Sequence, residues 1–218
     1  MHPKLDTSVP LPQVVYRVDN RPPERIFRDG FTPRGNNYRI TNHALGGANL
    51  ASTGYVSTTE NRDVAVQIAT SSVNAANDFW SCDGSGRAQC RTWVYRIMPR
   101  NTNFFSLVAN LPRTAQFDRY RGQHEWVAAD RIYGEAIIDA VPVTRHFTGV
   151  GTPTGFTPDG PVVFNDRQTR QNAGHNPNHE GYTPIAFDHV DVGPTARDCL
   201  PPTSPTYRSG QGRDVCAP

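Results

Sequence analysis

Long hydrophobic runs and blocks of like charge are both absent from this sequence. No apolar run approaches the roughly 18 residues that a membrane-spanning helix requires, and the mean hydropathy of -0.58 indicates a soluble protein. The 22 basic and 20 acidic residues nearly cancel to a net charge of +2, which gives no sign of a nucleic-acid or membrane partner. A length of 218 residues suffices for a sizeable core in one domain or one and a half.

Cysteine is scarce, and its four copies form two local pairs. Cys82 and Cys90 flank a turn sequence, while Cys199 and Cys216 flank a tail rich in proline, serine and glycine. Disulfide bonds within these pairs are the favoured arrangement, although sequence does not fix the connectivity, and they indicate an oxidising compartment and a secreted protein. Neither spacing is typical of zinc ligands. No signal peptide is visible, so we expect the numbering to start at a mature or engineered N-terminus.

Glycine and proline are abundant, with 18 and 19 copies, and this predicts a loop-rich protein with short strands. The pattern of apolar residues predicts a mixture of strands and helices. The expected strands are 14–18, 55–58, 91–97 and 132–141. The expected helices begin near Asn20, which is a possible cap, surround His43, and span 60–69.

The helix expected at 60–69 follows a threonine that suits its first turn. Thr59 is the predicted N-cap. At helical spacing, Val64 and Ile68, together with Ala65, are predicted to face the core.

The composition changes after residue 143, where glycine and proline recur every few residues. Only 162–164 and 185–187 in this part have the apolar character of strands. We therefore predict a core of residues 1–143, beginning with a flexible arm over 1–12, and a Pro/Gly-rich extension over 144–218 that packs on the core.

Two polar side chains precede an apolar segment near the middle of the chain. Gln123 and Glu125 are two residues apart, which would place both side chains on the same side of an extended strand. Trp126 and Val127 follow them and predict that this strand is buried. The simpler interpretation is an exposed strand end.

Three short motifs occur in a fixed order, and together they carry a resemblance. They are Arg17 in Tyr-Arg-Val-Asp, the Ser-Thr-Thr sequence that begins at Ser57, and Gln123-x-Glu125. This order resembles the pertussis-like branch of the mono-ADP-ribosyltransferase toxins. Residues 16–31 are similar to the amino-terminal signature of that branch almost residue for residue, and His43 falls where the branch has a histidine. The resemblance covers about Val14 to Val143.

The resemblance implies both a fold and a reaction. The implied fold is α+β, with two small, mainly antiparallel sheets that form an NAD cleft, and a loop-rich C-terminal extension. The implied reaction transfers ADP-ribose from NAD to a macromolecule and releases nicotinamide, with slow hydrolysis of NAD as a side reaction. NAD is then a substrate, and no metal is needed.

The resemblance also implies a role for each motif residue. Glu125 would stabilise the positive charge of an oxocarbenium-like transition state and hold the ribose 2′-hydroxyl. Arg17 would bind the NAD pyrophosphate with its planar guanidinium. Ser57 would orient the glutamate and the nicotinamide ribose, and Gln123 would position the incoming nucleophile. Thr58 joins the NAD-binding set by its place in the motif, and the alternative role for it is to hold the strand end.

Three further residues have alternative interpretations. His43 would act in the site, where it could activate the acceptor, or it could be a polar helix residue that faces water. Asp19 and Arg21 would either contribute to NAD binding or brace the turn between strand and helix by pairing with each other. His175 and His179 have a spacing that would suit a metal on a helix, but the proline between them forbids a regular helix there, so no metal site is expected.

The sequence also departs from the pertussis-like pattern. Glutamine at position 123 argues against arginine as the acceptor. Val64 and Ile68 stand where the branch has aromatic residues, so stacking on nicotinamide would come from elsewhere. No cysteine precedes Cys82, which removes the long-range disulfide of several relatives, and no segment suggests a delivery subunit.

The function predicted from the sequence is that of a secreted, toxin-like enzyme that acts inside a target cell. Its acceptor would be a non-arginine side chain of a host protein, which makes the protein a virulence factor. Two alternatives stay open: transfer to guanine in DNA, and a catalytically silent secreted binding module of the same fold.

Overall fold

The structure is a computed structural model, and it describes residues 5–74, 87–148 and 157–180. One antiparallel sheet of eight strands organises this part of the chain in the order β4-β5-β2-β1-β3-β6-β7, with β8 paired to β6. The strands are β1 (Val15–Asp19), β2 (Tyr55–Thr59), β3 (Arg87–Ile97), β4 (Phe104–Ser106), β5 (Glu125–Ala129), β6 (Ile137–Thr148), β7 (Thr157–Phe164) and β8 (Arg170–Gln171).

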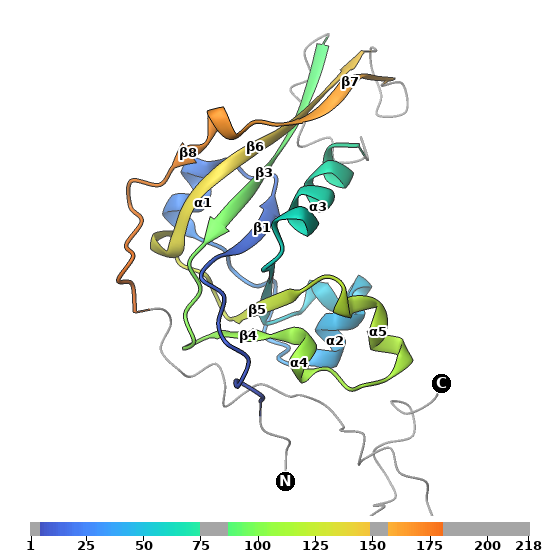
Figure 1. The fold of residues 1–218 in the computed structure, drawn as a ribbon, viewed down its shortest axis with the longest axis vertical. Coiled ribbons are helices and arrows are strands. Elements are labelled where there is room, and N and C mark those ends of the chain that lie inside the picture. Colours follow the sequence, from blue (N-terminus) through green and yellow to red (C-terminus); the bar gives the residue numbers. More distant parts are fainter. Residues whose placement is uncertain (1–4, 75–86, 149–156, 181–218) are drawn as a thin grey trace, which may run out of the picture.

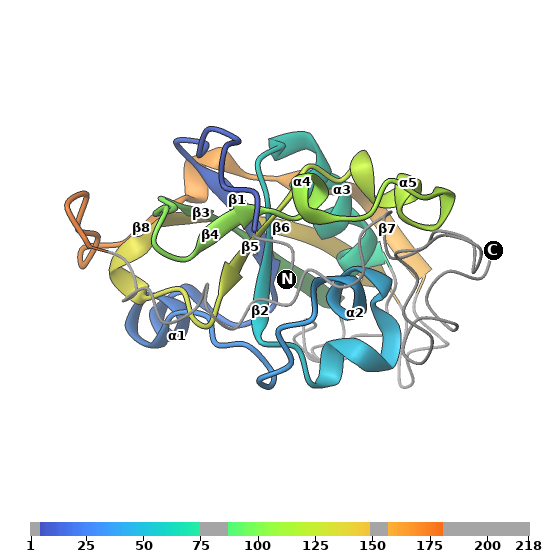
Figure 2. The ribbon, with the colours of Figure 1, turned by 90° about the horizontal axis from the view of Figure 1, so that it is seen from below.

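Helices lie beside this sheet, some near β4 and β5 and others near β1, β3 and β6 (Figures 1 and 2). They are α1 (Pro23–Asp29), α2 (Ile40–Leu45), α3 (Arg62–Asn74), α4 (Leu107–Asn110) and α5 (Ala115–Arg121), with short 3₁₀ turns η1 (Gly47–Ala51), η3 (Gly134–Ala136) and η5 (Asp166–Gln168). The helix α3 runs beside β1, β3 and β6, whereas α2, α4 and α5 gather near β4 and β5 (Figure 1).

The sheet is continuous but nearly divided at its centre. Strands β1 and β2 share the single register pair Tyr16 and Thr59, whereas β1 pairs with β3 over five residues. The half made of β4, β5 and β2 therefore diverges from the half made of β1, β3, β6 and β7. The predicted antiparallel α+β fold is confirmed, but the two predicted sheets form one continuous sheet, whose halves are joined through one residue pair.

Proline and glycine set the ends of α1. Pro23 occupies the first turn, where its missing N–H costs no hydrogen bond. Gly30 ends the helix with φ of 70°, a conformation that suits glycine. The predicted cap at Asn20 is wrong, because Pro22 takes the N-cap position.

Helix α3 begins two residues later than predicted. Asn61 caps it by accepting hydrogen bonds from the backbone N–H groups of Asp63, at 2.8 Å, and Val64, at 3.3 Å. Thr59 is therefore not the cap. Its hydroxyl instead donates to the carbonyl of Gln123 at 2.8 Å, which ties the end of β2 to the segment before β5.

The buried face of α3 is also shifted from the prediction. Ala65, Ala69 and Val73 recur at four-residue spacing and pack with β3 and β6 in one hydrophobic cluster. Ala65 is buried as expected, but Val64 is only half-buried and Ile68 is 47% exposed. Because alanine is small, α3 approaches the sheet closely at this face. The larger side chains of Val64 and Ile68 lie outside the buried face.

Residues of the predicted extension join the sheet of the core. Strand β6 crosses residue 143, and both β7 and β8 pair with it. The predicted strand 162–164 lies within β7, while 185–187 lies outside the described residues. Arg62 of α3 stacks on the ring of Phe164 at 4.6 Å and lies 3.6 Å from Asp166, so this segment also holds α3.

The predicted arm and cysteine pairs are only partly within the described residues. The backbone N–H of Asp6 donates to Asn110 Oδ1 at 2.7 Å, which attaches the described end of the arm to α4. Cys90 is buried in β3. Its predicted partner Cys82 lies outside the described residues, as does the pair Cys199 and Cys216, so both pairings stay predictions. None of the described helices is long and apolar enough to span a membrane.

Candidate active site

Two adjacent cavities, which share several lining residues, open where the halves of the sheet diverge. The smaller, of about 300 Å³, is lined by Arg17, His43, Ser57, Thr58, Gln123 and Glu125 among others. The larger, of about 590 Å³, is lined by Arg17, Asp19, Arg21, Arg34, His43 and Ser57 among others. Every residue predicted for the site therefore lines at least one of these two cavities, and Arg17, His43 and Ser57 line both.

Pairing between β2 and β5 fixes two of the motifs against each other. Ser57 is opposite Val127, and Thr59 is opposite Glu125. The hydroxyl of Thr58 is directed away from solvent and donates to the carbonyl of Trp126 at 2.7 Å. The motif in β2 and the first residue of β5 are thus held in register by the sheet itself.

Gln123 lines the smaller cavity from a turn and not from the predicted strand. Strand β5 begins at Glu125, and Gln123 lies in the turn after α5, where its N–H donates to the carbonyl of Tyr120 at 3.1 Å. His124 has φ of 48°, a left-handed conformation that interrupts any extended backbone. The prediction of strand alternation is wrong, because α5 continues to Arg121 and leaves the chain no room to be extended before Glu125.

His43 lies at the centre of the site. The residue is 4% exposed, and its Nε2 lies 3.0 Å from Ser57 Oγ and 3.3 Å from Glu125 Oε1. On the other side of the ring, Nδ1 lies 2.7 Å from the hydroxyl of Thr53. The interpretation of His43 as a helix residue that faces water is therefore wrong.

Arg17 lines both cavities, and its side chain is fixed by its surroundings. Its Nη1 donates to the carbonyl of Ser57 at 2.7 Å, and its guanidinium carbon lies 5.1 Å from the ring centre of Phe31. Burial lowers the pKa of Arg17, and the charge of Asp19 opposes this effect, so the guanidinium stays charged at any physiological pH. Its Nε is buried and lacks a hydrogen-bond partner among the described residues.

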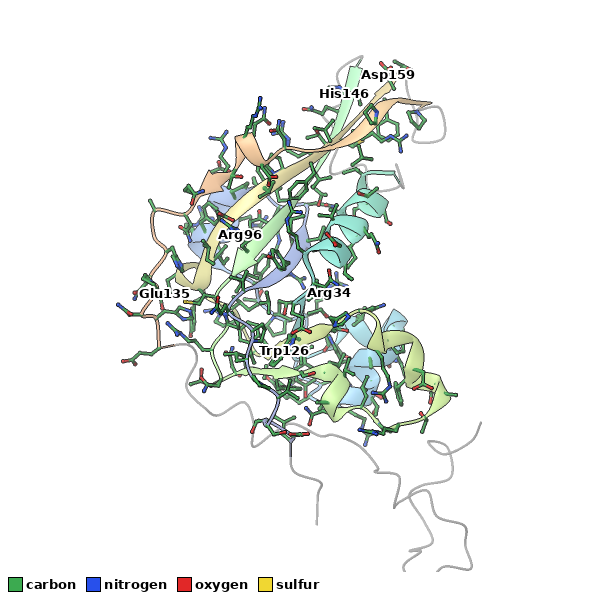
Figure 3. The ribbon with its side chains drawn as sticks, viewed as in Figure 1. Arg34, Arg96, Trp126, Glu135, His146 and Asp159 are labelled. Carbon is green, nitrogen blue, oxygen red and sulfur yellow. The ribbon has the colours of Figure 1, made fainter. Side chains whose placement is uncertain are left out.

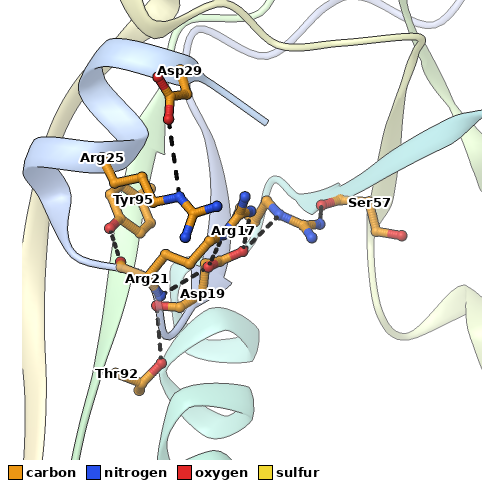
Figure 4. A network of polar contacts seen from close by, with 8 residues as sticks. All are labelled: Arg17, Asp19, Arg21, Arg25, Asp29, Ser57, Thr92 and Tyr95. Atoms are coloured by element: carbon orange, nitrogen blue, oxygen red, sulfur yellow. Dashed lines mark hydrogen bonds and ion pairs between the residues drawn. The ribbon is translucent and has the colours of Figure 1, made fainter. Parts of the chain in front are cut away.

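Asp19 and Arg21 form a compact network at the turn between β1 and α1 (Figure 4). The guanidinium of Arg21 donates twice to the carboxylate of Asp19, both times at 2.8 Å, and its backbone N–H donates a third time at 3.0 Å. The hydroxyl of Tyr95 donates to the carbonyl of Arg21 at 2.5 Å. Burial would raise the pKa of Asp19, but the hydrogen bonds and charge of Arg21 outweigh it and hold that pKa below its usual value. The pair braces this turn, and both residues also line the larger cavity.

Several residues of the cavities were not predicted from the sequence. Arg34 lines the larger cavity and is exposed; it lies between the two halves of the sheet in the view of Figure 3. Tyr120 lines the smaller cavity from α5 and supplies an aromatic ring there. Val64 and Ile68 line the same cavity. The sequence offered no motif for Arg34, whereas Tyr120 stands close enough to Gln123 to have been considered.

The two histidines of the C-terminal part bind backbone carbonyls. His175 Nδ1 lies 2.9 Å from the carbonyl of Glu135, and His179 Nε2 lies 3.1 Å from the carbonyl of Met98. They attach the segment after β8 to the turn before β6 and to the end of β3, which is a structural role.

Comparison with solved structures defines the class of fold. The structure superposes on nicked CARDS toxin with a TM-score of 0.54 at 19% identity, over 82% of this chain and 34% of that one. It superposes on a mutant of E. coli heat-labile enterotoxin with a TM-score of 0.52 at 20% identity, over 83% of this chain and 89% of that one. The fold is that of the ADP-ribosyltransferase toxins.

Sequence comparison points to one branch of these toxins. The family model described as pertussis toxin, subunit 1 matches residues 10–77. Pertussis toxin subunit 1 of Bordetella pertussis is 25% identical over 203 residues, which cover 87% of this chain and 74% of that protein. A homolog from Bordetella bronchiseptica is 26% identical over 204 residues with the same coverage. The predicted resemblance to the pertussis-like toxins is confirmed.

Proposed function

We propose that this chain is a secreted, toxin-like mono-ADP-ribosyltransferase that acts inside a target cell. It moves ADP-ribose from NAD to a non-arginine side chain of a host protein, releases nicotinamide, and hydrolyses NAD slowly. The observation that carries the proposal is the convergence of Arg17, His43, Ser57 and Glu125 on the smaller cavity between the halves of the sheet.

Glu125 is the residue placed to assist the chemical step. The bond between the ribose C1′ and nicotinamide breaks, and its electron pair leaves with nicotinamide. The ribose then carries positive charge in an oxocarbenium-like transition state, which an adjacent carboxylate stabilises. The acceptor supplies the electron pair of the new bond to C1′ and releases its proton to solvent water. The side chain of Glu125 is 13% exposed, so its charge is only partly screened by water.

Arg17 and Arg34 are the proposed partners of the NAD phosphates. The pyrophosphate of NAD carries two negative charges, and a guanidinium can bind phosphate oxygens through two parallel hydrogen bonds. Arg21 is already paired with Asp19. Arg34 has no acidic partner among the described residues and leaves its charge available to the larger cavity.

The remaining residues of the smaller cavity suit the nicotinamide and the acceptor. Val64 and Ile68 provide an aliphatic wall, and Tyr120 provides an aromatic one. Gln123 lies next to Tyr120 in the turn before β5, and its amide can both donate and accept a hydrogen bond to position the acceptor group.

The test compares the parent protein with Glu125→Gln, which keeps the shape of the side chain but removes its charge. NAD labelled in the adenosine part is incubated with host-cell lysate, with DNA, or with water alone. We expect label on protein, and a loss of roughly 10²- to 10³-fold in the variant. The exposed Glu24, in the first turn of α1, gives a matched control in Glu24→Gln, which should retain full activity.

The same experiment decides between the proposal and its alternatives. Label on DNA would replace the protein acceptor with guanine. If the parent protein transferred ADP-ribose and hydrolysed NAD no faster than Glu125→Gln, the enzyme proposal would fail. The remaining interpretation would be a catalytically silent binding module of the same fold.

Gln123→Ala separates acceptor binding from NAD binding. If Gln123 positions the acceptor, its removal should reduce transfer by roughly tenfold or more while NAD hydrolysis falls by less than about twofold. Both rates are measured with the same labelled NAD. Equal losses in the two rates would mean that Gln123 serves NAD binding.

A further inference from the structure

Thr53 supports His43 on the side of the imidazole ring opposite to Glu125. The residue is 5% exposed and lies just before β2. Its carbonyl accepts the N–H of Gly35 at 2.9 Å, which fixes its backbone. Its hydroxyl oxygen lies 2.7 Å from His43 Nδ1 and also accepts the N–H of Tyr55 at 3.2 Å.

The hydrogen bonds around Thr53 determine the direction of its contact with His43. A threonine hydroxyl has one proton to donate. Oγ1 of Thr53 accepts from Tyr55 with one of its two lone pairs, and Nδ1 of His43 is the one acceptor that the described residues offer to the hydroxyl proton within hydrogen-bond distance. In this arrangement Nδ1 is the acceptor and carries no proton.

The contacts on the other side of the ring lead to the same result. Nε2 of His43 lies 3.3 Å from Oε1 of Glu125, and an ionised carboxylate can only accept hydrogen bonds. A bare Nε2 would set one lone pair against another in a buried site. A proton on Nε2 instead satisfies Glu125 and can be shared with Ser57 Oγ at 3.0 Å.

We infer that Thr53 is a positioning residue that holds the imidazole of His43 as the neutral tautomer with its proton on Nε2. In this state His43 donates a hydrogen bond to Glu125 and does not present a basic nitrogen to the acceptor. The assignment of the tautomer stands on geometry alone, while its catalytic consequence rests on the proposed function.

A neutral donor at this position has a chemical advantage over an imidazolium. The hydrogen bond orients the carboxylate of Glu125 toward the cavity without cancelling its negative charge, and that charge is what stabilises an oxocarbenium-like transition state. Thr53 thus determines that the nitrogen facing Glu125 carries the proton, since the hydrogen-bond partner of one ring nitrogen sets the protonation of the other.

Nitrogen NMR of the parent protein tests the tautomer directly. In protein labelled with ¹⁵N-histidine, at about pH 8.5, where model imidazoles are neutral, Nε2 of His43 should have the shift of a protonated nitrogen and Nδ1 that of a bare one. The signal is assigned by its loss in His43→Gln. The opposite pattern, or protonation of both nitrogens, would overturn the inference, and this spectrum does not depend on any activity.

Two variants test the link from Thr53 to catalysis. Thr53→Val keeps the branched shape and removes the hydroxyl, so the His43 spectrum should shift toward the other tautomer. Its kcat for NAD cleavage should fall roughly tenfold, with the KM for NAD changed by less than about twofold. Thr53→Ser retains the hydroxyl and should recover the parent spectrum and most of kcat.

A buried threonine far from the site gives the matched control. Thr144 is 7% exposed in β6, and Thr144→Val should leave both the spectrum and kcat unchanged. Equal losses in Thr53→Val and Thr53→Ser, or a loss confined to KM, would overturn the positioning role. A parent without NAD cleavage would overturn the proposed function, and the spectrum would still decide the tautomer.

Discussion

At the residue scale, the charge of the larger cavity depends on which guanidinium groups are already neutralised. Arg21 forms an ion pair with Asp19 at 2.8 Å, which neutralises its charge. Arg17 lies 4.0 Å from the same carboxylate and is anchored to the carbonyl of Ser57. Arg34, which no motif predicted, adds a charge without an acidic partner among the described residues. The sequence predicted the types of residue that meet here, but not how their charges are shared, because that depends on which side chains the turns bring within contact.

Arg34→Ala should weaken the binding of NAD. The loss of one exposed cation facing a phosphate is expected to raise the KM for NAD roughly three- to tenfold, with little change in kcat. The increase should shrink as salt is added, because solvent-exposed charges are screened. Arg113, which is exposed beyond α4, provides the control Arg113→Ala. An unchanged KM at low salt would remove Arg34 from the NAD site.

Asp19→Asn should reveal the pH dependence of the turn between β1 and α1. The folded-state pKa of Asp19 lies below its unfolded value, so ionised Asp19 stabilises the fold above about pH 4, and this contribution disappears as the pH falls through the folded-state pKa. At pH 7 the variant should lose about 2 kcal/mol of the free energy of unfolding. Denaturant titrations at about pH 7 and about pH 3 should show the difference shrinking, while the exposed Asp159→Asn should differ little at either pH.

At the scale of single elements, the turn before β5 and the rotation of α3 explain what the sequence could and could not predict. Alternation predicted the position of β3, and the Ser-Thr-Thr motif predicted β2, because both are read from local sequence. The left-handed His124 was not predictable, since only the end of α5 and the bonds from β2 impose it. The exposure of Ile68 was missed because two possible helix faces were present, and the smaller one, around Ala65, packs more closely.

Gly30→Ala should loosen the attachment of α1 to the core. The residue has φ of +70°, and an added Cβ would lie 2.0 Å from the carbonyl oxygen of Ile132. That carbonyl accepts the N–H of Phe31 at 2.8 Å, so it cannot move without breaking the bridge between α1 and the segment before β6. We expect a loss of more than about 2 kcal/mol in the free energy of unfolding.

Gly122 offers the matched control for this substitution. Its φ is -72°, and an added Cβ would meet nothing within 4 Å, so Gly122→Ala should be neutral or slightly stabilising. Thermal or denaturant unfolding measures both variants. If the two substitutions had the same effect, the close approach at Gly30 would not be what limits that position.

At the scale of the whole molecule, the fold creates a site by holding two half-sheets apart while joining them at one point. The single pair of Tyr16 and Thr59 links the halves, and the cavities lie where they separate. Helix α3 forms one wall, and it is held from behind by Phe164 and Asp166 of the C-terminal part. The sequence placed Arg17 and Ser57 on strands, as the structure does, but it placed Gln123 on a strand that begins only at Glu125. The dependence of the wall on residues beyond 143 was not visible in local patterns.

The boundary predicted at residue 143 should therefore not behave as a folding boundary. A chain ending after Val143 would cut β6 and remove the partners of residues 87–91 in β3. It would also remove Phe164, which packs on the cluster under α3. A chain ending after Glu180 keeps every described strand. We expect the Tm of the shorter chain to be lower than that of the longer one by about 10 °C or more, since several kcal/mol of apolar burial and strand pairing are lost. Equal melting temperatures would show that residues 1–143 fold alone, and that β7 and β8 only cover a finished core.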